Sequence, residues 1–521
     1  MLARTQSASP LLRLRISSRS STGSGRRSIE NKALFLVVGS VCQHVVMTLS
    51  QLSVPQVDAS VDALWDAALP VLFDYIAIPA KSPAYAPNWA AEGHLADAVE
   101  LIRSWCVKNA PADATVVVHE IQGRTPLITI EVPAFGDPTS QDTVLLYGHL
   151  DKQPEMTGWR DGLGPWTPVL EGDRLYGRGG GDDGYSAFAI IGALNALRDA
   201  GGSHCRCVGL IEASEESGSV DLPAHLEQLG DFLGDISLVV CLDSGAADYD
   251  ALWATTSLRG GVGIELRVDV LDRGMHSGLM SGAAPTSMRV LRQLLDRVED
   301  PVTGEILLDG LHAEIPEGRI AEAYAAAIAG VDVRNDIAYA GATEAPPGSA
   351  ADMLLATTWE PTLCYVGIDG VPSLAEAGNV LRPYTTLALS FRLPPTVDCG
   401  EAAELLVEVL SADPPSNATV TVTATKGGNG WNAPATEPWL ADALEAASTS
   451  HFGRPAGAMG IGGGIPFMSM LGERYPDAQF LITGVLGPES NAHGPNEFLH
   501  LPTARKVTAC TAHVIDAHAR R

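Results

Sequence analysis

The sequence is poor in basic residues, and this scarcity narrows the classes of partner that we expect. Lys and Arg number 34 among 521 residues, against 62 Asp and Glu, which leaves a formal net charge of −28. A chain of this charge repels phosphate backbones and anionic membrane surfaces. We therefore expect no nucleic-acid partner, and part of the acidity is available to bind cations.

Long hydrophobic runs are also missing. No segment approaches the roughly 20 apolar residues that a membrane-spanning helix needs, so we expect no membrane partner and a cytoplasmic protein. Residues 1–46 are rich in Ser and Arg and hold only a short apolar run at 33–38. They fit a transit peptide, fit a secretory signal poorly, and fit equally well a true translation start at Met47. We treat 1–46 as an unstructured tail or a mis-assigned start.

Cysteine is sparse and follows no pattern. The eight cysteines form no CxxC motif and no Cys/His cluster with zinc-ribbon spacing. Cys205 and Cys207, the only close pair, would point to opposite faces of a strand. We expect buried, reduced thiols, so that a metal site in this chain should use His and carboxylate ligands. Such ligands favour a catalytic site over a structural one.

The length allows two domains plus a tail, because single hydrophobic cores stop growing well before 521 residues. Helical spacing of apolar residues predicts helices at 61–78, 92–106 and 185–198. Short apolar or β-branched runs predict strands at 115–118, 127–132, 144–147, 208–211, 238–242 and 480–485. Strands that alternate with helices predict an α/β domain with a largely parallel sheet flanked by helices.

The middle of the chain has a different pattern. Apolar and polar residues alternate strictly at 263–270 and 386–393, which predicts strands with one face in water. Between them, 286–300 has an apolar helical stripe. We therefore predict a smaller α+β lid or dimerisation domain at 256–394. It would be inserted between the two parts of the larger domain, which we place at 47–255 and 395–521.

Histidines and carboxylates fall repeatedly at the ends of predicted strands. The groups in such places are His149 and Asp151, Glu215 and Glu216, Asp243, and His493. In open α/β sheets, ligands bind beyond the carboxyl ends of the strands, so we expect these groups to share one cleft. Asp182, in a Gly-rich turn before a predicted helix, could reach the same cleft.

Each of these features is weak by itself, because solvated loop residues would explain it equally well. The functional interpretation is that Asp151 accepts a hydrogen bond from the second ring nitrogen of His149 and so fixes the tautomer that binds metal. The glycine turn before Asp182 lacks the Lys-Ser/Thr of a phosphate-binding loop, and its two aspartates would repel an anion. The joint placement of these groups favours a metal site.

Five segments resemble the motifs of the M20 metallopeptidase family, in order from about Val61 to the C-terminus. They are Tyr147-Gly148-His149-Leu150-Asp151, Leu175 to Asp183, Glu215 to Ser219, Met275-His276-Ser277-Gly278, and Ala492 to Glu497. The likeness is in particular to the carnosinase and cytosolic non-specific dipeptidase branch. It implies a zinc-exopeptidase-like catalytic domain that cleaves the amide bond of dipeptides or similar small substrates with a free carboxylate.

The resemblance also implies two Zn²⁺ ions per subunit, although Mn²⁺ and Co²⁺ suit the same ligand types. The implied ligands are His149 and Asp243 for one ion, Glu216 and His493 for the other, and Asp182 as the bridge. Glu215 would be the general base that acts on a metal-bridging hydroxide. Asp151 would belong to the same catalytic group.

Substrate contacts follow from the resemblance as well. His276, on the inserted domain, would reach across a homodimer interface and polarise the scissile carbonyl in the partner's active site, although an ordinary turn histidine is the simpler interpretation. Arg392 would bind the substrate carboxylate near the backbone of Gly463 and Gly464. The residues themselves support Arg392, because it faces away from the apolar side of its strand and a guanidinium pairs bidentately with a carboxylate.

The chain departs from the family pattern at two places. It has Gly184-Tyr185 where the family usually has Lys-Gly, and Gly464 where the family usually has Ser before Ile-Pro. Both departures leave the implied ligands intact and bear on substrate choice. The alternatives are an N-acyl amino acid deacylase or a carboxypeptidase with the same metal centre and, from a different class, a catalytically silent binding protein. Retention of Glu215 argues against the silent protein.

Overall fold

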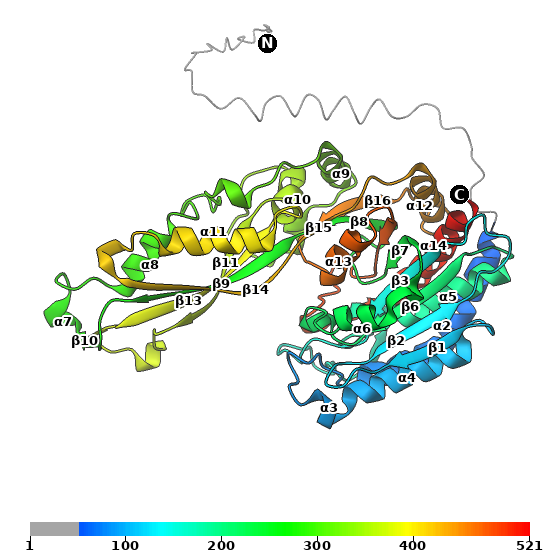
Figure 1. The fold of residues 1–521 in the computed structure, drawn as a ribbon, viewed down its shortest axis with the longest axis horizontal. Coiled ribbons are helices and arrows are strands. Elements are labelled where there is room, and N and C mark those ends of the chain that lie inside the picture. The colour runs from blue at the N-terminus through cyan, green and yellow to red at the C-terminus, as the bar shows by residue number, and fades with distance from the viewer. Residues whose placement is uncertain (1–51) are drawn as a thin grey trace, which may run out of the picture. The chain divides into compact units, whose positions relative to one another are not determined.

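The structure, a computed structural model, describes residues 52–521 (Figure 1). The predictions for residues 1–46 lie outside the described residues. The described chain opens with α2 (Val54–Ala77), the short α3 (Trp89–Glu92) and α4 (His94–Asn109). None of the helices between residues 52 and 521 is long and apolar enough to cross a membrane.

A six-stranded sheet of order β1-β2-β6-β3-β7-β17 forms the centre of the larger domain. Its strands are β1 (Thr115–His119), β2 (Leu127–Val132), β3 (Thr143–His149), β6 (Arg206–Glu212), β7 (Ile236–Cys241) and β17 (Gln479–Ile482). β3 pairs in parallel with β6 and β7, and β7 with β17, whereas β2 joins β6 and β1 in an antiparallel manner. The predicted α/β class with a largely parallel sheet is confirmed.

Helices cover both faces of this sheet (Figure 1). One core includes side chains of α2, α4, α5 (Ser186–Asp199) and α14 (Leu501–Arg520), and the other includes those of α6 (Leu222–Leu229) and α13 (Pro466–Arg474). Along β3, Val144 and Leu146 join the first core, and Leu145 and Tyr147 join the second. β3 is buried along its whole length, as expected for a parallel strand with helices on both faces.

The inserted domain contains an antiparallel sheet of order β11-β13-β9-β14. Its strands are β9 (Gly260–Asp269), β11 (Thr362–Asp369), β13 (Tyr384–Leu393) and β14 (Thr419–Gly428), and its core includes side chains of α8 (Ser287–Leu295) and α11 (Cys399–Ser411). The two predicted alternating strands are β9 and β13. The domain boundaries stay a prediction, and this sheet extends beyond residue 394 because β14 pairs with β9.

A separate three-stranded sheet of order β15-β8-β16 leads into the inserted domain, and the chain crosses between this sheet and the four-stranded sheet twice, at closely packed glycines. One crossing runs from β8 (Trp253–Leu258) to β9, and the other from β14 to β15 (Trp431–Asn432). A Cβ added to Gly430 would lie 2.6 Å from the Leu258 carbonyl oxygen and 2.7 Å from the Gly260 nitrogen. The two crossings can pack this closely only because these positions have no side chain.

The cysteines of the described residues are free thiols, as predicted. Five of them are buried, but Cys364 is exposed and Cys399 is partly exposed. Both exceptions lie in the inserted domain, where one face of the antiparallel sheet is in contact with water. The expectation of buried thiols is therefore wrong for Cys364.

Candidate metal centre

The structure brings the predicted ligand residues together at the carboxyl edge of the six-stranded sheet. They lie at the end of β3 (His149), in the turn after β6 (Glu215, Glu216), just after β7 (Asp243), in the turn η2, Gly180–Gly184, before α5 (Asp182), and in the loop after β17 (His493). Because these strands run parallel, their carboxyl ends meet at one edge. The result is two groups of three ligand atoms, and the atoms within each group lie within 4.8 Å of one another.

The first group consists of His149, Asp182 and Asp243. Nε2 of His149 lies 3.4 Å from Asp182 Oδ1 and 3.7 Å from Asp243 Oδ1. His149 is fully buried, and its Nε2 has no hydrogen-bond partner within residues 52–521. An unpaired buried nitrogen is costly, and a divalent cation among these three atoms would satisfy it. The donor set therefore fits a metal ion.

The second group consists of Asp182, Glu216 and His493. Nε2 of His493 lies 3.0 Å from Asp182 Oδ2 and 3.3 Å from Glu216 Oε2. Asp182 thus offers Oδ1 to the first group and Oδ2 to the second. A carboxylate with one oxygen directed at each of two adjacent sites has the arrangement of a bridging ligand.

The carboxylates of the centre repel one another. Burial and the neighbouring Asp182 raise the pKa of Glu216 to about 8. Burial and Asp243 hold the pKa of Glu215 well above its ordinary value. Burial alone would lower the pKa of His493, but the contact with Asp182 and the attraction of Glu216 raise it to about 9. The centre has an excess of negative charge, which bound cations would neutralise.

Asp151 holds the Glu215-Glu216 turn through its carboxylate. Its two oxygens each accept a hydrogen bond of 3.1 Å, one from the N–H of Glu215 and one from the N–H of Glu216. Nδ1 of His149 lies 3.1 Å from the Asp151 carbonyl oxygen and 3.5 Å from its carboxylate Oδ1. The nearer partner of the His149 ring is therefore the backbone of Asp151, not the carboxylate that we predicted. Either contact leaves Nε2 directed at the centre.

A buried ion pair that the sequence analysis did not single out holds the His493 loop. Arg178 donates to the Glu497 carboxylate and, over 2.8 Å, to the Gly494 carbonyl oxygen. Glu497 also accepts a hydrogen bond of 2.8 Å from the Gly179 N–H. These contacts connect the two loops that present ligands to the second group. Both charged residues lie inside the family-like motifs, but nothing in the sequence shows that they pair.

Gln153 is a further residue of the centre that sequence reasoning missed. Its side-chain amide donates to Glu216 Oε2 over 2.5 Å. The contact orients one carboxylate oxygen of Glu216. The other oxygen, Oε1, has no hydrogen-bond partner in the described part of the chain. An isolated Gln two residues after Asp151 gives no signal of this role.

The structure explains the first departure from the family pattern. A Cβ added to Gly184 would lie 2.0 Å from Tyr75 Cε1 and 2.6 Å from the Gly179 carbonyl oxygen, so no side chain fits there. The Tyr185 hydroxyl donates to the Leu242 carbonyl oxygen over 2.5 Å. Gly184 therefore packs against Tyr75, and the Tyr185 side chain contacts the strand end that precedes Asp243.

Arg392, Gly463 and Gly464 lie outside both ligand groups, near the domain crossing. Arg392 is exposed on β13, and the glycines follow β16 (Gly457–Ile461). Arg259, which sequence reasoning missed, lies close to both: its Nε donates to the Gly462 carbonyl oxygen over 3.3 Å. Burial and the nearby Arg392 lower the pKa of Arg259 to about 10. Two neighbouring guanidinium groups suit an anionic substrate group.

The structure does not bring His276 to the ligand groups of its own subunit. His276 is exposed on β10 (Met275–His276), which pairs with β12 (Val380–Leu381) beyond the Asp269 end of β9. The crossing lies at the other end of this ten-residue strand, about 30 Å away at 3.3 Å per residue. His276 is therefore separated from the domain crossing by about the length of β9.

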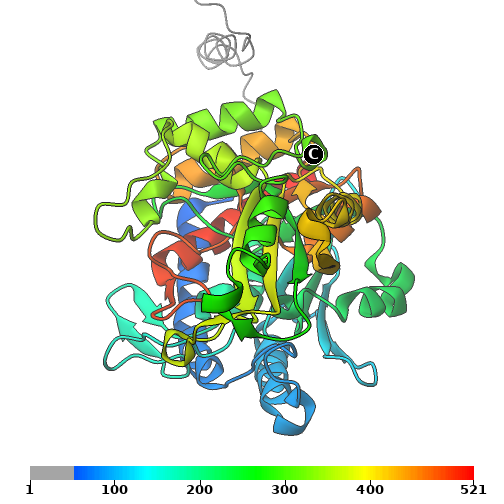
Figure 2. The same cartoon turned by 90° about the vertical axis from the view of Figure 1, so that its left-hand side faces the viewer.

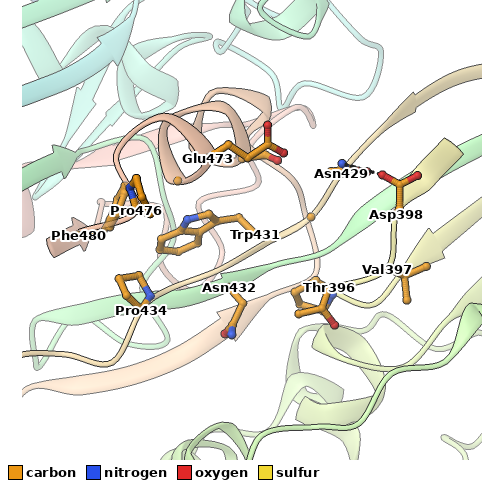
Figure 3. A pocket seen from close by; sticks show the side chains of 14 residues that line it. Thr396, Val397, Asp398, Asn429, Trp431, Asn432, Pro434, Glu473, Pro476 and Phe480 are labelled. Carbon is orange, nitrogen blue, oxygen red and sulfur yellow. Dashed lines mark hydrogen bonds between the residues drawn. The ribbon is translucent and has the colours of Figure 1, made fainter. Parts of the chain in front are cut away.

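A cavity of about 480 Å³ lies beside the domain crossing (Figure 3). Trp431 and Phe480, with ring centres 5.2 Å apart, form part of its wall. Asn429 donates a hydrogen bond of 3.2 Å to Asp398 on another side of the cavity. None of the residues that line it belongs to either metal-ligand group, and none was predicted as a site residue.

The fold and the two ligand groups with their shared carboxylate define the class of metal-dependent hydrolases with an α/β catalytic domain. The family model described as peptidase family M20/M25/M40 matches residues 145–517. Because this match extends over most of the sequence, the chain belongs to that family. The resemblance seen in the five motifs is confirmed.

Relatives of known name agree with this assignment. The cysteinylglycine-S-conjugate dipeptidase of Corynebacterium striatum is 29% identical over 388 residues, which are 71% of this chain and 79% of that protein. The structure of human carnosine dipeptidase 1 has a TM-score of 0.69 at 22% identity, over 90% of this chain and 100% of that one. The M20 metallo-carboxypeptidase Sso-CP2 of Sulfolobus solfataricus has a TM-score of 0.72 at 19% identity, over 87% and 99% of the two chains. These structural likenesses show the shared fold.

Proposed function

We propose that this protein is a dipeptidase-type metallohydrolase, which cleaves the amide bond of dipeptides or similar small substrates with a free carboxylate. The observation that supports it most is the pair of ligand groups joined by Asp182, with Glu215 on the turn beside them. The activity in the name of the Corynebacterium striatum relative supports the dipeptide substrate class.

His149 and Asp243 would hold one metal ion and Glu216 and His493 the other, with Asp182 between them. Zinc is the ion that we propose, and Mn²⁺ and Co²⁺ also suit these donors. When bound, the pair of ions supplies Lewis-acid charge and lowers the pKa of coordinated water from about 16 towards 7.

Glu215 would act as the general base. It would accept a proton from the water whose oxygen adds to the amide carbon, and it would return that proton to the amine nitrogen as the C–N bond breaks. The two hydrogen bonds of Asp151 to the backbone of Glu215 and Glu216 fix the turn on which the base stands. A base held in this way needs little reorganisation during the reaction.

Arg392 would bind the substrate carboxylate, with Arg259 beside it and the backbone of Gly463 and Gly464 nearby. A paired guanidinium site favours substrates with a free carboxylate over neutral amides. Closure of the inserted domain about the crossing would bring Arg392 towards the metal centre and exclude water.

A homodimer through the inserted domain would complete the site. β11 lies at one edge of the sheet, and its Tyr365, Val366 and Ile368 are 52%, 65% and 55% exposed. Exposed apolar side chains on an edge strand are typical of an interface. The position of His276, far from its own ligand groups, supports a role in the partner's active site, where it would donate a hydrogen bond to the scissile carbonyl.

The test is a substrate panel assayed with purified full-length protein that contains metal. We expect hydrolysis of dipeptides in preference to N-acyl amino acids and longer peptides. Glu215→Gln should lower kcat by about 10²–10⁴-fold with the bound metal unchanged, whereas the matched control Glu227→Gln, an exposed carboxylate on α6, should have no effect. Preference for N-acyl amino acids or for C-terminal residues of longer peptides would indicate the deacylase or carboxypeptidase alternative, and full activity of Glu215→Gln would refute the role of the base.

A further inference from the structure

A second cluster of side chains of metal-binding types lies at the amino ends of the parallel strands of the six-stranded sheet. The candidate metal centre lies at the carboxyl ends of the same strands. Asp142 directly precedes β3, and Cys205 directly precedes β6, its parallel neighbour. His518 comes from the last turn of α14. The seven residues of β3 separate the two ends of this strand by about 20 Å at 3.3 Å per residue. The cluster shares no residue with the two ligand groups of the candidate metal centre.

The three side chains converge on one point. One ligand atom from each of Asp142, Cys205 and His518 lies within 4.8 Å of the other two. Cys205 and His518 are fully buried, and Oδ1 of Asp142 is inaccessible to solvent. A carboxylate oxygen, a thiol and an imidazole from segments that are far apart in the sequence have therefore been enclosed together.

In both His518 and Asp142, one polar atom has a partner and the other does not. Nε2 of His518 is hydrogen-bonded to Ser237 Oγ over 2.8 Å, and the other oxygen of Asp142 binds the Arg521 guanidinium. His518 Nδ1 and Asp142 Oδ1 have no hydrogen-bond partner among residues 52–521. Metal-binding imidazoles and carboxylates commonly combine one such hydrogen bond with one atom that is left for the metal.

The thiol has a single proton, and both Asp142 and the Ser140 carbonyl oxygen, which is 3.4 Å from Cys205 Sγ, lie near it. Buried polar atoms without a partner, such as His518 Nδ1 and Asp142 Oδ1, are unfavourable. A cation bound by the three side chains would add a partner in this buried place.

We propose that Asp142, Cys205 and His518 form a mononuclear site for a thiophilic divalent cation of the Zn²⁺ type, separate from the dinuclear centre. Thiolate, imidazole nitrogen and carboxylate oxygen are zinc ligands, and a water molecule would complete a tetrahedral set. On binding, the Cys205 thiol releases its proton to solvent and a metal–sulfur bond forms, so one proton leaves for each ion bound. The site would fasten the end of α14 to the amino ends of β3, β6 and β7, which is a structural role.

Cobalt provides a direct test, because the proposed site contains a sulfur ligand and the candidate dinuclear centre does not. Full-length protein is loaded with Co²⁺, and its near-ultraviolet spectrum and cobalt content are measured. We expect three Co²⁺ per chain and an intense thiolate-to-cobalt charge-transfer band. The dinuclear centre has only nitrogen and oxygen donors, so it cannot produce this band, and failure of the proposed dipeptidase activity would leave the band unaffected.

Variants assign the band to particular residues. Cys205→Ser should abolish the band and weaken the third cobalt by more than about 100-fold, since loss of even an outer-shell partner costs about 10–100-fold, while peptidase activity remains. The matched control is Cys207→Ser, which changes a buried cysteine two residues further on, within β6, whose side chain joins the hydrophobic core with α2, α4, α5 and α14. This variant should keep the band. If Cys205→Ser does not fold, His518→Gln should show the same loss of the third cobalt. A wild-type protein with no thiolate band, or a band that survives Cys205→Ser, would overturn the proposal.

Discussion

At the residue scale, two ion pairs connect the loop that carries His493 to an earlier segment of the chain, and one of them is buried whereas the other is exposed. The side chains of Arg178 and Glu497 are 1% and 0% exposed, whereas those of Arg174 and Glu489 are 39% and 70% exposed. Loss of one partner of a buried pair leaves an uncompensated charge, which is strongly destabilising. An exposed pair contributes about 0–1 kcal/mol. The buried pair should therefore control the order of the loop.

The substitution Glu497→Gln tests this difference. Burial raises the pKa of Glu497 to about 7, although Arg178 opposes the shift. The carboxylate is therefore charged at pH 8 and mostly protonated at pH 5. Because the fold raises this pKa, the wild type loses unfolding free energy as the pH rises from 5 to 8, whereas Glu497→Gln cannot ionise and lacks this loss. We therefore expect the deficit of the variant relative to the wild type to be largest at pH 5 and to shrink by about 3 kcal/mol towards pH 8, and we expect the variant to bind the ion of the second ligand group more weakly. Urea unfolding at the two pH values and metal analysis measure these effects.

Glu489→Gln is the control for this experiment, because it removes the exposed pair of the same loop. It should change the unfolding free energy by less than about 1 kcal/mol at either pH. Equal effects of the two substitutions, or an effect of Glu497→Gln that does not depend on pH, would contradict the role assigned to the buried pair.

At the scale of elements, the crossing from the three-stranded sheet into the inserted domain is a place where the backbones of two connections pack closely. The helices α9 (Glu317–Ile328) and α10 (Ala350–Thr358) form a small core of their own with β8 and β16 next to this crossing. The crossing strands approach so closely at Gly260 and Gly430 that neither position has room for a Cβ. A change there should affect both stability and domain closure.

Gly430→Ala should force the crossing strands apart. A methyl group 2.6 Å from the Leu258 carbonyl oxygen must displace backbone rather than a flexible side chain, and overpacking of this kind costs about 1–3 kcal/mol. We expect a lower midpoint in urea and a reduced kcat/KM for dipeptides. Gly428→Ala is the matched control, because a Cβ there meets nothing within 4 Å. Equal urea midpoints and equal kcat/KM values for the two variants would contradict the importance of close packing at Gly430.

At the scale of the whole molecule, the separation of His276 from its own ligand groups leads to a prediction about subunits. In a homodimer whose sites borrow His276 from the partner, a His276→Ala chain and a Glu215→Gln chain are each inactive, but each supplies what the other lacks. Random mixing makes half of the dimers mixed, and one site in each mixed dimer is intact.

Mixing the two inactive variants in equal amounts, with subunit exchange, should therefore restore about one quarter of the wild-type activity. The measurement is dipeptidase activity before and after exchange, with analytical ultracentrifugation to follow the dimer. A mixture of Glu215→Gln with wild-type chains should keep the same activity whether or not subunits exchange, so it is the control for loss of activity during the procedure. If activity does not return although mixed dimers form, His276 acts within its own subunit or not at all.

Much of the fold could be predicted from the sequence, because local patterns are sufficient for it. The strict alternation in β9 and β13 and the apolar runs of β3, β6 and β7 reflect which faces of a strand are buried. The rule that ligands meet at the carboxyl ends of parallel strands then placed His149, Glu216 and Asp243 at one edge. The short Ala-rich helix α9 was missed because few of its residues are buried, so its apolar stripe is faint.

What the sequence by itself determined is therefore the type of each main element and the residues that end the central strands. Only the tertiary structure decided the contacts that no local pattern encodes. Arg178 pairs with Glu497 across 319 residues of sequence, Gln153 meets Glu216, and Asp142 and Cys205 meet His518 at the far edge of the sheet. The reason is physical: element type depends on neighbours a few positions away, whereas such contacts depend on how distant segments pack around a shared core.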